Sequence, residues 1–123
     1  MRKTEIRVEG VDAFFERGRK LARSADRGAS IAPCRVLAFE DVGAFLRVLT
    51  EKRVMLLREL KETPASISGL ARKLKRDRSA VTRDVQLLES LGVVRVTEKP
   101  LPGHGRMKWV SPVARDIRLT AQL

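Results

Sequence analysis

Arginine, glutamine and short hydroxyl side chains recur in the segment Arg76-Asp-Arg-Ser-Ala-Val-Thr-Arg-Asp-Val85, which continues into the helical sequence Gln86-Leu-Leu-Glu-Ser-Leu-Gly92. Ser, Thr and Asp are weak helix formers in mid-helix, so local stability does not explain their presence. Arginine can pair with guanine and glutamine with adenine, serine and threonine suit either base, and an alanine methyl can contact thymine. This chemistry is recognition of base edges in a DNA groove. The residues expected to carry it are Ser79, Ala80, Thr82, Arg83 and Gln86.

Positive charge is concentrated just before these residues, and Asp77 is the only acidic residue between Ala71 and Arg83. Long cationic side chains suit phosphate oxygens, and such contacts fix the register of a protein on DNA without distinguishing its sequence. We therefore expect a phosphate-contacting group around this turn. It comprises Ser66, Arg72, Lys73, Lys75, Arg76 and Arg78.

The apolar residues predict the helices that position these side chains. Helical spacing places Val81, Val85, Leu88 and Leu91 on the core face of a helix over residues 79–91, and Gly92 ends it as a left-handed residue. Ser66 is suited to cap a short helix over residues 67–74. A further helix over residues 51–62 follows Thr50 as its N-cap and stops at Thr63-Pro64.

Two strands, at residues 93–98 and 106–110, follow the last of these helices and enclose a loop that contains two prolines and two glycines. A helix, a short helix, a turn, a longer helix and a two-stranded ribbon are the element order of a winged helix-turn-helix. On the ribbon, or wing, His104, Arg106 and Lys108 are expected to extend the contact with the nucleic acid.

The remaining residues predict further elements at both ends. Alternating polarity indicates strands at residues 4–9 and 117–123, and a third strand is expected at 35–39. A helix is expected over 11–25, and Glu40 and Asp41 suit the N-terminus of another. The predicted fold class is therefore α+β: a winged helix-turn-helix with additional N- and C-terminal strands. Its expected divisions are an arm at 1–40 for dimerisation, a DNA-binding domain at 41–112 and a terminal strand at 113–123.

The end strands also suggest how two chains assemble. Ile6 and Val8 share one face of the first strand, and Ile117, Leu119, Ala121 and Leu123 share one face of the last. We expect these strands to join a small sheet whose apolar face packs on the first helix and forms a homodimer interface. The alternative is that they only complete the core of each chain.

Composition limits the classes of function. Among 123 residues, 26 are Lys or Arg and 15 are Asp or Glu, which gives a net charge of +11 and favours a polyanionic partner. The excess lies mainly in residues 51–123, with 16 basic and 8 acidic side chains. Short apolar runs predict no membrane segment, and the single Cys34 together with the absence of a signal-peptide pattern predicts a cytoplasmic protein.

Little in the sequence suits catalysis or cofactor binding. Cys34 and His104 are the only cysteine and histidine, and they lie 70 positions apart without metal-ligand spacing. Gly103-His-Gly105 lies in a loop tip and precedes no helix, so it does not form a phosphate-binding loop. We expect no enzyme activity, no metal and no cofactor.

The stretch Ser66-Ile-Ser-Gly-Leu-Ala-Arg-Lys-Leu74, with Ser79-Ala-Val-Thr-Arg-Asp-Val-Gln-Leu-Leu-Glu-Ser-Leu-Gly-Val-Val94, resembles the MarR- and ArsR-like winged-helix transcriptional regulators. Residues 35–123 more narrowly resemble a small antitoxin-like group of regulators. The resemblance implies a DNA-binding repressor that acts as a dimer. Gly69 departs from the pattern, because many relatives carry an acidic residue there that completes a capping box with Ser66. The predicted C-terminal strand differs from the long terminal helices through which MarR proteins dimerise.

Three functions follow as hypotheses. The first is sequence-specific binding of double-stranded DNA by a homodimeric transcriptional repressor. The second is a protein-interaction module, such as an antitoxin that neutralises a toxin protein, with DNA binding secondary. RNA binding is third, and it is poorly supported because four of the five aromatic residues fall at expected core positions.

Overall fold

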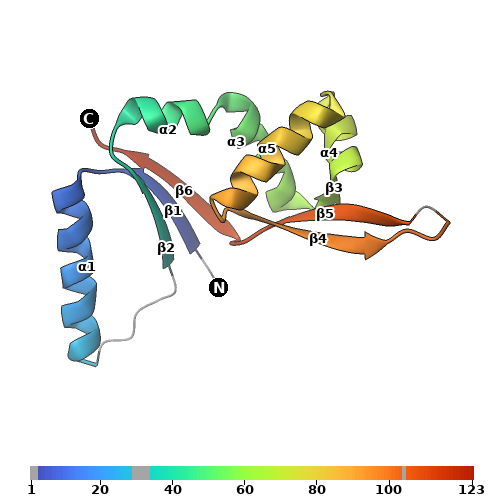
Figure 1. The fold of residues 1–123 in the computed structure, drawn as a ribbon. Helices are drawn as coiled ribbons and strands as arrows, with labels where there is room; N and C mark the ends of the chain where they lie inside the picture. Colours follow the sequence, from blue (N-terminus) through green and yellow to red (C-terminus); the bar gives the residue numbers. More distant parts are fainter. Residues whose placement is uncertain (1–2, 29–33, 104) are drawn as a thin grey trace. The chain divides into compact units, whose positions relative to one another are not determined.

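The computed structural model describes residues 3–28, 34–103 and 105–123 (Figure 1). The chain forms two compact units. The first, which we call the terminal unit, comprises Met1–Leu49 and Ala114–Leu123, and the second, the central unit, comprises Thr50–Val113. Among the described residues, none of the helices combines the length and the apolar composition that a membrane crossing requires.

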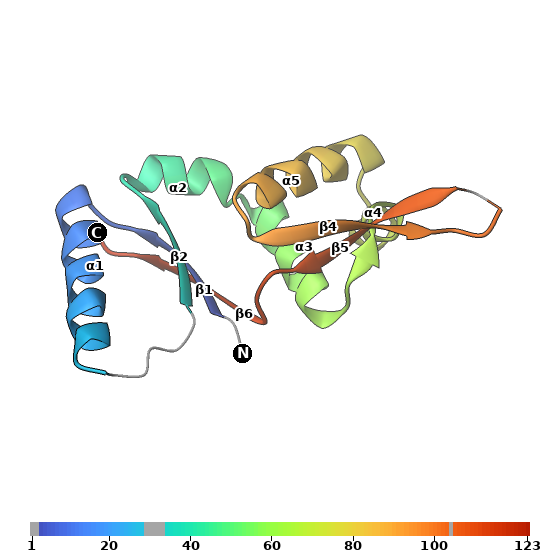
Figure 2. The ribbon, with the colours of Figure 1, turned by 60° about the horizontal axis from the view of Figure 1, so that its bottom comes forward.

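The terminal unit is built on a parallel three-stranded sheet in the order β2-β1-β6, whose strands lie side by side in Figures 1 and 2. The strands predicted at the two ends of the chain therefore do join one sheet. Its elements are β1 (Lys3–Val8), α1 (Val11–Asp26), β2 (Cys34–Phe39), α2 (Val42–Val48) and β6 (Asp116–Ala121).

The apolar face of this sheet centres on Ile6, which is fully buried. Ile6 pairs with Leu37 of β2 and Leu119 of β6, and side chains at paired positions share a face. On the same face, Phe39 meets Phe45 of α2 edge to face, with ring centroids 6.0 Å apart. The helix that covers the apolar face is thus α2. The expectation that the first helix does so is wrong, because no residue of α1 is buried.

The position of α2 also changes the boundary between the two units of the chain. Residues 41–49 were expected in the DNA-binding domain, whereas α2 contacts β1 and β2 and belongs to the terminal unit. Its start follows the expected chemistry, because the Asp41 carboxylate accepts a hydrogen bond from the Ala44 amide at 2.8 Å.

The central unit combines three helices with an antiparallel sheet in the order β3-β5-β4. Two expected features begin and end its first helix: Thr50 accepts a hydrogen bond from the Arg53 amide at 3.3 Å, and Thr63-Pro64 follow the last residue. The elements are α3 (Glu51–Glu62), β3 (Ala65–Ser66), α4 (Ile67–Leu74), α5 (Arg78–Ser90), β4 (Val94–Pro100) and β5 (Arg106–Pro112).

The core of the central unit lies between these helices and the sheet. On α5, Val81, Val85 and Leu88 are buried as predicted, and Leu91 is half-buried. The sheet contributes Val110, and the two-residue strand β3, absent from the sequence prediction, pairs Ala65 with it. The other buried apolar residues are Leu56, Leu57, Leu60, Ile67, Leu70, Ala71, Val93 and Val94.

Two left-handed residues end the helices that flank the turn. Gly92 has φ 75° after α5, as the sequence predicts, and a glycine adopts this conformation without a steric penalty. Lys75 has φ 53° after α4, where it is the non-glycine residue with positive φ among those described. The tight turn between α4 and α5 therefore depends on a lysine in a conformation that costs L-residues about 1–2 kcal/mol.

Two substitutions on α3 test the position of this core. Leu60 is fully buried and Met55 is half exposed, so Leu60→Ala should lower the free energy of unfolding by about 2–5 kcal/mol and Met55→Ala by less than about 0.5 kcal/mol. Urea denaturation of both variants measures the difference. Equal losses would contradict the packing of α3.

Candidate nucleic-acid interface

The helix-turn-helix is formed by α4, the turn at residues 75–77 and α5 (Figure 1). Ser66 begins α4, because its Oγ accepts a hydrogen bond from the Gly69 amide at 3.0 Å. An added Cβ at Gly69 would lie 3.1 Å from that oxygen, so the glycine leaves room for the cap. Asp77 then stands in extended conformation before the first residue of α5. These local features fix where α4 begins and place Asp77 at the N-cap of α5.

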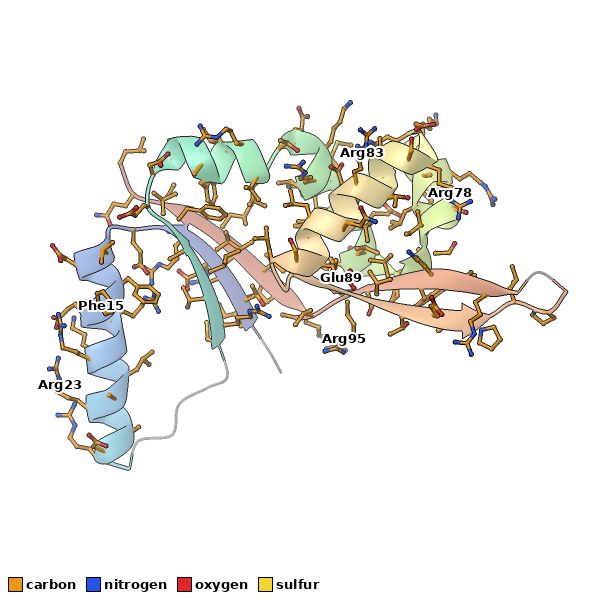
Figure 3. All side chains as sticks on the ribbon, in the orientation of Figure 1. Phe15, Arg23, Arg78, Arg83, Glu89 and Arg95 are labelled. Atoms are coloured by element: carbon orange, nitrogen blue, oxygen red, sulfur yellow. The ribbon has the colours of Figure 1, made fainter. Side chains whose placement is uncertain are left out.

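The outer face of α5 is polar and exposed opposite its buried valines and leucine. Arg78 and Arg83, labelled in Figure 3, come from the N-terminal half of the helix. The structure brings all five predicted base-contacting residues onto this helix: Ser79, Arg83 and Gln86 are exposed, and Ala80 and Thr82 are half-buried. An open depression at the start of the helix is lined by Asp77, Arg78, Ser79, Thr82 and Arg83.

The two hydroxyl groups on this face already donate hydrogen bonds within the protein. Thr82 Oγ1 donates to the Arg78 carbonyl at 2.8 Å, and Ser79 Oγ donates to the Asp77 carboxylate. Each oxygen keeps lone pairs that can accept a further hydrogen bond. The hydrogen bond from Ser79 also lowers the pKa of the exposed Asp77 carboxyl group.

The cations predicted to contact phosphate fall into two groups. Arg72, Lys73, Lys75 and Arg78 are exposed on α4, the turn and the start of α5. Lys73 lies 3.4 Å from Glu59, but about half of its side chain remains exposed, so this pair contributes little to stability.

Arg76 differs from the other predicted phosphate contacts. Its guanidinium is turned inward: Nη2 lies 2.7 Å from Asp84 Oδ2, and only 16% of the side chain is exposed. The other carboxylate oxygen of Asp84 accepts from Arg53 Nε of α3 at 3.0 Å. We call Arg53, Asp84 and Arg76 the buried ion triad. The triad joins α3, the turn and α5, so Arg76 holds the motif together rather than facing a ligand.

Asp84 is the residue that the sequence analysis missed. Asp84 has no role among the predictions from the sequence, yet only 8% of the residue is exposed. Its helical spacing from Val81, Val85 and Leu88 places it beside the core face of the helix. This spacing was the sequence pattern that could have identified Asp84 as buried. Its partners were not predictable locally, because Arg53 lies 31 positions away.

The wing carries two of its predicted residues on one face. Arg106 and Lys108 of β5 are exposed, and they share the face of Val110 because alternate residues of a strand point the same way. Arg106 lies 3.4 Å from Glu98 of β4 in an exposed pair. On the opposite face, Lys99 lies over the ring of Trp109, with Nζ 4.2 Å from the ring centroid. His104 lies outside the described residues.

Metal ligands do not gather in the part of the chain that the structure describes. There, no group of three or more His, Cys, Asp or Glu side chains is arranged to hold a metal ion. Cys34 is exposed on β2.

The fold and this geometry define a winged helix-turn-helix protein. The protein family described as HVO_A0114 matches residues 48–118, which is more than half of the chain, so the chain belongs to that family. No curated protein matches the chain.

Solved structures are similar to the chain in fold. One from Methanosarcina mazei Go1, described as a possible transcriptional regulator, superposes with a TM-score of 0.52 at 18% identity and covers 63% of this chain and 68% of its own. A homodimeric winged helix-turn-helix DNA-binding domain from Mycobacterium bovis, a possible ArsR-family regulator, gives 0.48 at 16% identity, covering 59% and 64%. NolR from Sinorhizobium fredii gives 0.46 at 19% identity, covering 58% and 68%. At these identities the likeness concerns the fold alone.

Removing the carboxylate of the buried ion triad should destabilise the helix-turn-helix. Asp84→Ala leaves the Arg53 and Arg76 guanidinium groups without their common partner, and we expect a loss of about 2–4 kcal/mol in the free energy of unfolding. Glu89→Ala is the matched control, because Glu89 is an exposed acid on the same helix and its loss should cost less than about 0.5 kcal/mol. If both variants unfold at the same urea concentration, the triad does not stabilise the motif.

Proposed function

We propose that the protein is a sequence-specific double-stranded DNA-binding transcriptional regulator that acts as a homodimeric repressor, with α5 as its recognition helix. The observation that carries this proposal is the exposed outer face of α5, which presents Arg83 and Gln86 within a helix-turn-helix whose turn is surrounded by exposed cations. A helix in this position enters the major groove, and its N-terminal residues meet base edges.

Direct base recognition falls to the long side chains of α5. Arg83 can donate two hydrogen bonds to a guanine, and Gln86 can pair with an adenine. The remaining lone pairs of Ser79 and Thr82 suit a base amino group, because the two hydroxyl protons are already donated to acceptors of the chain itself. Ala80 is half-buried and offers a methyl group for a thymine.

Phosphate contacts fall to the exposed cations of α4 and the turn, Arg72, Lys73 and Lys75, and to Arg78. Ser66 fits the same group, because its oxygen accepts from the Gly69 amide and its own hydroxyl proton remains available. Arg106 and Lys108 would add contacts from the wing. Arg76 is excluded from the residues proposed to contact phosphate, because its guanidinium is bonded to Asp84.

A protein-interaction role, such as that of an antitoxin, is the second candidate. One observation favours protein binding of some kind: α1 exposes large apolar side chains, including Phe14 and Phe15. This surface belongs to the terminal unit, whereas the recognition face of α5 belongs to the central unit.

A mobility-shift titration tests the proposed function. The full chain is mixed with duplex DNA from upstream of its own gene and with random duplex of equal length, at several salt concentrations. Binding to the upstream DNA should be at least about a thousandfold tighter than to random DNA. Equal affinities for the two duplexes would overturn sequence-specific binding.

The recognition helix should control specificity rather than general affinity. Arg83→Ala or Gln86→Ala should reduce the difference in binding free energy between upstream and random DNA by about 1–3 kcal/mol, because each removes a base contact. Arg58→Ala is the control, since Arg58 is exposed on α3 outside the helix-turn-helix. The same titration gives the values. A uniform loss for both duplexes would mean that these side chains do not contact bases.

Substitution of the phosphate-contacting cations should change the response to salt. Arg72→Gln or Lys75→Gln should weaken binding to every sequence and reduce the slope of log affinity against log salt by about one unit each. Arg76→Gln should instead lower the free energy of unfolding, because Arg76 is bonded to Asp84. Unchanged slopes for Arg72→Gln and Lys75→Gln would place the DNA on another face.

A further inference from the structure

Asp77 is the single acidic residue in the stretch from Ala71 to Arg83, which holds six lysines and arginines. It is exposed, and it lines the open depression at the start of α5 together with Ser79 and Arg83. DNA phosphates repel a carboxylate in this position, so Asp77 lowers the affinity for DNA in general. The carboxylate favours binding only where a hydrogen-bond donor of the DNA meets it.

Several groups of the chain hold the Asp77 carboxylate at the start of α5. The Ser79 hydroxyl donates a hydrogen bond to one of its oxygens. This bond is the main cause of the lowered pKa of Asp77, and the Ser79 and Ala80 amides and the charge of Arg83 act in the same direction. The carboxylate therefore lies near Arg83. A carboxylate has about four lone-pair sites, so the hydroxyl and the two amides leave it able to accept from a ligand.

An acceptor close to an arginine matches the major-groove edges of guanine and cytosine. Guanine presents O6 and N7, two acceptors that suit Arg83, and cytosine presents its N4 amino group, a donor that suits the Asp77 carboxylate. Adenine also has an amino group, but its N7 acceptor lies beside that group and would repel the second carboxylate oxygen. Thymine presents only the O4 acceptor and a methyl group. The carboxylate thus favours cytosine over the other three bases.

Capping of α5 is the alternative role of Asp77, because the residue stands at the N-cap of this helix. Serine caps helices about as well as aspartate does. A serine side chain is shorter and carries no charge, so it cannot replace the carboxylate in a contact with a base. The substitution Asp77→Ser therefore separates a capping role from a role in recognition.

We propose that Asp77 determines sequence specificity: its carboxylate accepts a hydrogen bond from the N4 amino group of a cytosine, beside the guanine that Arg83 contacts. The proposal rests on the proposed function, because it requires α5 to lie in the major groove. DNA that lacks a cytosine at this position meets a carboxylate without a donor. Asp77 therefore penalises incorrect sequences, whereas the surrounding cations strengthen binding to all sequences.

Selection from a library of random duplexes tests the contact with the full chain. The parent protein should enrich duplexes that carry a cytosine within one base pair of a guanine, and Arg83→Ala should lose the preference for that guanine. Asp77→Ser should lose only the preference for the cytosine. Glu89→Ser is the matched control, because it removes one exposed acid from the end of α5 opposite Arg78 (Figure 3), and it should keep both preferences.

A base analogue isolates the amino group. In the selected duplex, the cytosine is replaced by 2-pyrimidinone, which lacks only the N4 amino group. This replacement should weaken binding of the parent and of Glu89→Ser by about tenfold, and binding of Asp77→Ser by less than about twofold. Because each protein is compared with itself on two duplexes, a change in protein stability does not alter the ratio.

Binding to a random duplex gives a second readout, which capping alone would not change. Asp77→Ser should bind random DNA about threefold more tightly than the parent at low salt, because one repulsion from the phosphates is removed. Glu89→Ser should change this affinity less.

The outcomes separate this inference from the proposed function. If Asp77→Ser discriminates the cytosine duplex from the 2-pyrimidinone duplex as strongly as the parent does, the contact is overturned while sequence-specific binding stands. The same holds if the parent enriches specific duplexes without the cytosine. If the parent enriches no sequence at all, both the contact and the proposed function are wrong.

Discussion

The helix-turn-helix depends on one carboxylate that is held between two guanidinium groups. Asp84 projects from the inner side of α5 and bonds Arg53 of α3 at 3.0 Å and Arg76 of the turn at 2.7 Å. Removing one charge from such a group is costly, whereas the intact group contributes little more than an apolar replacement would. We infer that the triad specifies the rotation and register of α5 more than it adds stability. That rotation decides which residues face outward.

The consequence for function lies in the adjacent residues. Because Asp84 is fixed inward with Val81 and Val85, Arg83 and Gln86 must point away from the core. The same triad draws Arg76 inward and leaves Lys75 and Arg78 exposed beside it. One stretch of sequence thus serves both stability and recognition, because some of its residues are buried in the core and their neighbours are exposed on the outer face. The separate terminal unit carries its own core around Ile6, and no residue of its helix α1 is buried.

Local chemistry made much of the fold predictable. Thr50, Ser66 and Gly92 act at helix ends as their residue types indicate, and the spacing of Val81, Val85 and Leu88 identified the buried side of α5. Contacts between residues far apart in the sequence were harder to predict. The strand β3 has only two residues, and the triad joins positions 31 and 8 residues apart. The sequence predicted a helix over residues 11–25, but it could not show that α2 rather than this helix would cover the sheet.

Nuclear magnetic resonance titration of the full, ¹⁵N-labelled chain with its upstream duplex would test the central claim most directly, because it locates the contact residue by residue. We expect the largest amide shifts in residues 75–86 and smaller changes at Arg106 and Lys108. Random DNA should shift the amides of the turn but not those of Arg83 and Gln86. Shifts confined to α1 and the sheet of the terminal unit would contradict recognition by α5.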